Sequence, residues 1–152
     1  MELKTGSADS TLDEKGRINI SVNFRDQFQG KLFMTRGMEP CVWIMTPSAW
    51  EQFERNLRKK KYTPKVWRQI EYKYLHHKHE VEIDKAGRIA IPPPIREYAN
   101  LTRECIVISA GNRLSVWDSG TFNEYCAETD PIVEEAISEL GSQDIFEANQ
   151  AD

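Results

Sequence analysis

The sequence has few cysteines and no long apolar stretch. Its three cysteines, Cys41, Cys105 and Cys126, are an odd number without C-x-x-C spacing, which predicts reduced thiols used in packing rather than a disulfide framework or a zinc site. The longest apolar runs, such as residues 105–109, are far too short to cross a membrane. The first thirty residues carry scattered charges instead of a continuous apolar core, so no secretory signal is expected and the protein is expected in the cytoplasm.

The signatures of common enzyme classes are also absent. There is no G-x-S-x-G elbow, no Walker loop and no H-E-x-x-H helix. The chain is therefore expected not to be an enzyme, to need no cofactor and to bind no small-molecule substrate. His76, His77 and His79 lack the i, i+4 spacing that places two imidazoles on one face of a helix, which argues against a metal site.

Basic residues are missing from the last fifth of the chain. Residues 124–152 hold nine acidic residues and no Lys or Arg, although the net charge of the whole chain is only −4. All 20 basic residues lie in residues 1–123, where they outnumber the 15 acidic ones. A mildly basic body is thus followed by an acidic segment, and the overall charge of the chain hides this division.

The body contains one pattern twice. T-L-D-E-K-G-R-I-N-I-S-V-N-F-R over residues 11–25 matches E-I-D-K-A-G-R-I-A-I-P-P-P-I-R over residues 82–96 at a constant offset of 71. After a shift of three residues, Trp43 and Trp117, each in an apolar run, also correspond. The repeat predicts two similar modules. We expect a first module with its helix, a basic helical connector, a second module, and an acidic helix with a tail, at residues 1–62, 63–80, 81–126 and 127–152.

Each repeat predicts the same series of local structures. Period-2 alternation of apolar residues around D-x-x-G-R indicates a β-hairpin with a tight turn. A short helix follows, capped by Ser21 in the first copy and started by Pro92–Pro94 in the second. A further hairpin then closes each unit, formed by residues 32–35 with 42–45 and by residues 105–109 with 114–117. The predicted fold class is therefore α+β.

Three amphipathic helices are expected outside these hairpins. Trp50, Phe53 and Leu57 mark the first, which begins near Ser48. The second begins after Pro64 and continues to about residue 79. The third runs from residue 131 to residue 140, where Gly141 stops it, and disorder is expected beyond it.

Two motif-bearing turns in this order, with the Trp-containing segments between them, closely resemble the MraZ family of bacterial transcriptional regulators. The resemblance covers roughly residues 9–126 and rests on L-D-E-K-G-R, I-D-K-A-G-R-I-A-I-P-P-P-I-R-E-Y-A, C-V-W-I-M-T-P-S-A-W and V-I-S-A-G-N-R-L-S-V-W-D. One departure is Ser21, which stands where the second copy has Pro92. The acidic segment after Cys126 matches the family only loosely, so no role is transferred to it.

The resemblance implies a fold and a function. It implies two tandem, pseudo-symmetric AbrB-like modules, which are swapped-hairpin β-barrels. It also implies a ring-shaped homo-oligomer, associated with the nucleoid, that binds double-stranded DNA at direct repeats in the promoter of the division and cell-wall gene cluster. The D-x-x-G-R loops contact DNA in the family, and that role carries over to these positions: Asp13, Lys15, Gly16, Arg17, Asp84, Lys85, Gly87 and Arg88. Arg25 and Arg96 match a following arginine of the family pattern.

The chemistry of the motif agrees with that role. An arginine leaving a tight turn can donate two parallel hydrogen bonds to O6 and N7 of guanine, whereas the adjacent lysines suit phosphates. The alternative is an ordinary turn with a local Asp–Arg ion pair. Other residues have a structural interpretation: the Lys/Arg run at residues 58–61 is expected to be a solvated helix face, and the four tryptophans are expected in core or interface packing.

Two other function classes remain open at this point. The paired hairpins could form a structural or protein-binding assembly module in which the acidic segment binds a partner. An antitoxin-like protein that neutralises a toxin through that segment is the third hypothesis, although such a protein usually needs only one copy of the module.

Overall fold

The computed structural model describes residues 5–141. Its contacts divide the chain into two compact units, residues 1–119 and residues 120–152. Every strand of the described residues lies in the first unit, and the described part of the second unit is helical. The expectation of disorder beyond Gly141 concerns residues outside the described span. Among residues 5–141, helices combined with antiparallel strands agree with the predicted α+β class.

The main sheet has six strands in the order β1-β7-β8-β4-β3-β5, and all of its pairs are antiparallel. The strands are β1 (Thr5–Thr11), β3 (Leu32–Arg36), β4 (Val42–Met45), β5 (His79–Val81), β7 (Glu104–Ala110) and β8 (Arg113–Asp118). The predicted hairpins β3–β4 and β7–β8 are confirmed. β1 and β5 are the two edges, so this sheet does not close on itself.

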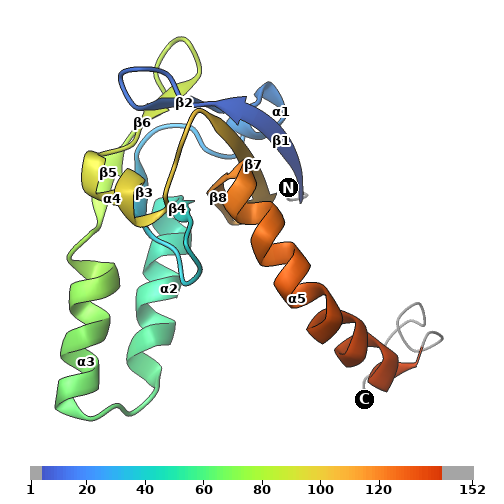
Figure 1. Ribbon diagram of the computed structural model, residues 1–152. Helices are drawn as coiled ribbons and strands as arrows, with labels where there is room; N and C mark the ends of the chain where they lie inside the picture. Colours follow the sequence, from blue (N-terminus) through green and yellow to red (C-terminus); the bar gives the residue numbers. More distant parts are fainter. Residues whose placement is uncertain (1–4, 142–152) are drawn as a thin grey trace. The chain divides into compact units, whose positions relative to one another are not determined.

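Strands of one repeat pair with strands of the other. β1 pairs with β7 over seven residues, β5 pairs with β3, and β2 (Arg17–Asn19) pairs with β6 (Arg88–Ala90) in a separate two-stranded sheet. Figure 1 shows β1 alongside β7. The predicted hairpins around the two D-x-x-G-R turns are therefore wrong in their pairing, because β2 and β6 pair with each other, and the only strand bridge between the two sides of the first turn is the isolated Leu12↔Ile18. Alternation specifies which face of a strand is buried, but it does not specify the partner strand.

Five α-helices complete the described structure. They are α1 (Val22–Arg25), α2 (Pro47–Lys59), α3 (Pro64–Ile70), α4 (Pro93–Tyr98) and α5 (Ser119–Leu140), and a π-helical turn (Glu71–Leu75) continues α3. Local signals explain their starts, since Ser21, Thr46 and Thr63 each accept a hydrogen bond from a backbone N–H of the following helix. Ser21 (φ −53°, ψ 139°) has almost the same backbone as Pro92 (φ −60°, ψ 146°), so this departure from the motif leaves the backbone unchanged.

Two predicted helix boundaries are wrong. The helix expected to reach residue 79 ends earlier, because residues 79–81 form edge strand β5 and pair with β3. The helix expected to start at Pro131 starts at Ser119, and Pro131 lies inside it. The missed signal is a half-buried stripe of Phe122, Tyr125 and Thr129 at i, i+3 and i+7, which extends the helix in front of the proline. The predicted end at Gly141, with φ +80°, is confirmed.

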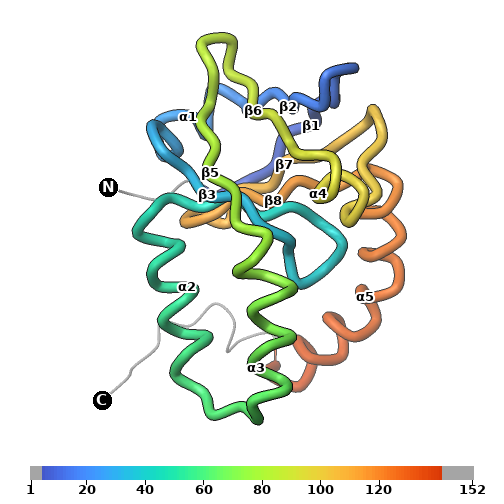
Figure 2. The backbone as a smooth tube through the Cα atoms, turned by 90° about the vertical axis from the view of Figure 1, so that its left-hand side faces the viewer, coloured from blue at the N-terminus to red at the C-terminus, as the bar shows by residue number. Residues whose placement is uncertain are grey.

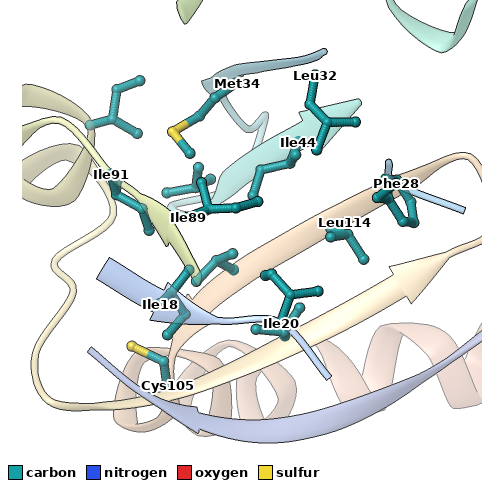
Figure 3. Close-up of a cluster of buried hydrophobic side chains, with 14 of the residues drawn as sticks. Ile18, Ile20, Phe28, Leu32, Met34, Ile44, Ile89, Ile91, Cys105 and Leu114 are labelled. Atoms are coloured by element: carbon teal, nitrogen blue, oxygen red, sulfur yellow. The ribbon is translucent and has the colours of Figure 1, made fainter. Parts of the chain in front are cut away.

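Equivalent residues of the two repeats meet in one core. Ile18 and Ile20 from the first copy pack with Ile89 and Ile91 from the second, and all four are at most 2% exposed (Figure 3). Three of the four tryptophans are buried as predicted, namely Trp43, Trp50 and Trp117. Cys41 and Cys105 are buried free thiols, as expected for packing residues, and burial raises their pKa values to about 12 and about 11. The two repeats therefore share a single hydrophobic core within the first unit.

Candidate functional site

The two D-x-x-G-R turns have the same internal geometry. Oδ1 of Asp13 accepts hydrogen bonds from the backbone N–H groups of Lys15 and Arg17, both at 2.9 Å. Oδ1 of Asp84 accepts from Ala86 and Arg88 at the same distance. The glycine of each turn adopts the left-handed conformation, with φ +76° at position 16 and +83° at position 87. The aspartate and the glycine of each motif thus both contribute to closing the tight turn.

The two motif arginines lie on one face of the β2–β6 sheet. Arg17 is opposite Ala90, and Arg88 is opposite Asn19. Because opposed residues point to the same side, all four occupy the face opposite the buried pair Ile18–Ile89, with the two arginines diagonal to each other. The strand pairing between repeats therefore brings Arg17 and Arg88 together, although 71 positions separate them in the sequence.

Both guanidinium groups form ion pairs with the turn aspartates, within one repeat and between the two repeats. Nε of Arg17 is 2.8 Å from Oδ2 of Asp13, and Nε of Arg88 is 3.4 Å from Oδ2 of Asp84. Nη1 of Arg88 is also 3.8 Å from Oδ2 of Asp13, which links the two repeats. The ion pair of an ordinary turn is therefore present in both copies. The arginine side chains are nevertheless 29% and 34% exposed, so they are not buried in the body of the protein.

Exposure to solvent weakens the ion pairs between these arginines and aspartates but does not abolish them. A partly exposed ion pair contributes only about 0–1 kcal/mol, because water competes for both charges. Each aspartate also uses a separate oxygen, Oδ1, for the backbone of its turn. A guanidinium can therefore leave its carboxylate for another acceptor while the turn stays closed.

Arg25 and Arg96 have a role that sequence reasoning did not define. A Cβ at position 87 would collide with the guanidinium of Arg25, and a Cβ at position 16 would collide with that of Arg96. Each arginine thus covers the turn glycine of the other repeat. Nε of Arg25 also donates to O of Ile20 at 2.7 Å. The repeat alignment had shown that these arginines match each other, but not that each contacts the opposite turn.

Backbone hydrogen bonds support the same exchange between repeats. N–H of Ile20 donates to O of Gly87, and N–H of Ile91 donates to O of Gly16, both at 2.8 Å. Each D-x-x-G-R turn is thus held by the strand that follows the other turn. The two turns form one composite surface, and they lie at the end of the first unit opposite helices α2 and α3 (Figures 1 and 2).

The motif lysines have a different environment from the arginines. Lys15 and Lys85 are exposed within their turns, and neither has an ion pair with a described residue. A free ammonium group on a turn is available to an anion. The surface therefore offers two solvent-facing lysines beside two arginines that are already paired.

The turn aspartates should make the site sensitive to acid. The backbone N–H of Arg17 lowers the pKa of Asp13 below its ordinary value of 3.8, and that of Arg88 does the same for Asp84. A lowered folded-state pKa gives stability that is present above the ordinary value and is lost as the pH falls through the folded-state pKa. We expect both carboxyls to titrate below 3.8 in an NMR pH series, and both turns to lose order only in that acid range. Ordinary titration of both would contradict the hydrogen-bonded turns.

Other candidate features of the sequence form no comparable site. Residues 5–141 contain no group of three or more His, Cys, Asp or Glu side chains placed to hold a metal ion. Trp67, the fourth tryptophan, is half-buried and stacks on Tyr62, with ring centroids 6.0 Å apart. No helix of the described span is both long and apolar enough to cross a membrane.

Comparison with known families agrees with the duplicated geometry. The sequence model of one family, described as "MraZ protein, putative antitoxin-like", matches the chain twice, over residues 4–73 and residues 74–140. The two matches together span nearly the whole chain, and they confirm the tandem repeat. The description is that of an antitoxin-like protein and not that of an enzyme.

Proposed function

The chain belongs to the MraZ family, and on this basis we propose that it is a transcriptional regulator that binds double-stranded DNA in a sequence-specific manner. Its target is the set of direct repeats in the promoter of the division and cell-wall gene cluster. The observation that supports this most strongly is the composite surface, where strand pairing between repeats places Arg17 and Arg88 on one face of the β2–β6 sheet.

The arginines are proposed to supply sequence recognition. A guanidinium fits O6 and N7 of guanine through two parallel hydrogen bonds, a contact that discriminates against a wrong base by about 1–3 kcal/mol. Asp13 and Asp84 hold the guanidinium groups in place before DNA arrives, and their Oδ2 atoms release them to the base edge. Pre-positioning lowers the entropy lost on binding.

The lysines are proposed to supply affinity. Lys15 and Lys85 are exposed beside the arginines and suit the phosphates of the DNA backbone, which carry no sequence information. Release of counterions from those phosphates makes binding strongly dependent on salt. Gly16 and Gly87 contribute indirectly, since they keep both turns in the conformation that presents these side chains.

The proposed function also includes assembly of several copies on one DNA. A ring-shaped homo-oligomer would place several composite surfaces along a series of direct repeats, and the weak contacts would combine through effective concentration. We also propose that each half follows the AbrB-like, swapped-hairpin plan, which accords with strands shared between repeats. The four-part division at residues 1–62, 63–80, 81–126 and 127–152, the cytoplasmic location and nucleoid association belong to the same proposal.

Fluorescence anisotropy tests the proposed function. The full chain is titrated into a labelled duplex containing the direct repeats of its own gene-cluster promoter, and into a duplex of equal composition with a scrambled order, across a salt series. We expect the promoter duplex to bind at least tenfold more tightly, and both affinities to fall steeply as salt rises. Equal affinities at every salt concentration would contradict sequence recognition, and no binding at low salt would contradict DNA binding itself.

A further inference from the structure

The end of helix α5 has an apolar face without a partner among the described residues. Ile132, Val133, Ile137 and Leu140 are 47% to 66% exposed. Their spacing places them on one side of the helix. Residues 128–140 also hold five acidic residues and no basic one, so carboxylates border this apolar face. We call residues 128–140 the acidic half of α5.

A basic surface lies where α2 passes into α3. Helices α2 and α3 run side by side, and the loop that joins them lies at their far end (Figure 2). Residues 58–68, which we call the basic tip, hold six Lys or Arg and no Asp or Glu. The six basic residues are all exposed: Arg58, Lys59, Lys60, Lys61, Lys65 and Arg68.

The basic tip also has an open groove. A cavity of about 460 Å³ is lined by two aromatic and three basic residues: Tyr62, Trp67, Arg58, Lys60 and Lys61. The guanidinium of Arg58 lies over the ring of Trp67, 5.0 Å from its centre. Val66, the residue before Trp67 in α3, is 46% exposed. Apolar side chains flanked by carboxylates would match the aromatic rings and the positive charge of this surface.

We propose that the acidic half of α5 binds the basic tip of a second copy of this chain. A coiled coil between two α5 helices is disfavoured, because it would bring five carboxylates of one helix against five of the other. Binding to the basic tip avoids this repulsion. The apolar face of α5 enters the groove, and the carboxylates that flank this face lie beside Lys60 and Lys61. The pair of surfaces is heterologous, so successive copies join head to tail, and they close into a ring when the rotation between neighbouring copies divides a full turn evenly. The inference rests on the self-association in the proposed function but not on DNA binding.

Charge reversal tests the contact in the full-length chain. We expect Lys60→Glu/Lys61→Glu and Glu135→Lys/Glu139→Lys each to lower the mass measured by sedimentation velocity toward that of the single chain, 17.6 kDa. An equimolar mixture of the two variants should regain most of the assembled mass, because each variant then offers the surface that the other lacks. Recovery in a mixture requires contact between copies, so it excludes binding of α5 to the basic tip of its own chain.

Two controls separate this contact from other causes of dissociation. Arg103→Glu reverses a charge whose side chain is 84% exposed and lies outside both surfaces, and it should leave the mass unchanged. Ile137→Ala/Leu140→Ala removes apolar area without changing charge, and it should raise the dissociation constant at least tenfold. If wild-type protein assembles and both reversals leave its mass unchanged, this interface is overturned while the proposed function stands. A monomeric wild-type chain would overturn the interface and also the ring.

Discussion

Arg88→Ala is expected to weaken binding to the promoter duplex by about 100-fold or more while barely changing binding to the scrambled duplex. One lost guanine contact costs about 1–3 kcal/mol, or about 5- to 150-fold, and several subunits on one DNA multiply that loss. Arg17→Ala should act in the same way. Retention of promoter selectivity by the double variant would defeat recognition by these arginines.

Two matched variants show which property of Arg88 matters. Arg88→Lys keeps the positive charge but loses the planar guanidinium that donates two parallel hydrogen bonds. The preference for the promoter duplex should therefore fall, while the salt dependence of DNA binding remains. Lys85→Ala should weaken binding to both duplexes by a similar factor and leave their ratio unchanged. The fold should survive in Arg88→Ala, because the ion pairs it removes are partly exposed. Thermal unfolding and sedimentation of each variant provide that check.

Gly87→Ala should lower the free energy of unfolding by about 2–3 kcal/mol and the melting temperature by roughly 5–10 °C. Two costs combine at this position. Alanine at φ +83° adopts a left-handed backbone, and its Cβ displaces the guanidinium of Arg25 from the turn. That displacement also breaks the hydrogen bond from Arg25 to O of Ile20. Calorimetry on the purified variant measures the change.

The chain provides a control that separates the two costs. Gly30 has φ +75°, but nothing lies within 4 Å of a Cβ built there, so Gly30→Ala tests the backbone cost alone. We expect about 1 kcal/mol for that change. Equal losses for Gly30→Ala and Gly87→Ala would show that Arg25 is displaced at no cost. Adding Arg25→Ala to Gly87→Ala should make the two changes non-additive, because they share one contact.

Local features of this structure could be predicted from sequence, because short-range chemistry determines them. Ser21 caps its helix, Asp13 and Asp84 close their turns, and the β7–β8 hairpin follows from two apolar runs around a glycine. Each of these depends on residues only a few positions apart. The motif itself also indicated which side chains the turns would present.

The pairing of strands and side chains that lie far apart in the sequence could not be predicted in the same way. Nothing in residues 5–11 specifies β7 as their partner rather than the nearer β2, since both offer an alternating strand. The sequence likewise aligned Arg25 with Arg96 without indicating that each would cover the opposite glycine. The ion pair between Arg88 and Asp13 depends on this same exchange. The candidate site was thus predictable residue by residue, but its composite character was not.

The pairing of β1 with β7 has a consequence during protein synthesis. Thr5 pairs with Ala110, so β1, the first strand to leave the ribosome, stays unpaired until β7, one of the last strands, has been synthesised. At about 5–20 residues per second, that delay is about 5–20 s, and during it a strand with unpaired backbone groups is open to partners on other nascent chains. Folding of the sheet is therefore completed late in translation or after it, as a single event that requires both halves of the chain.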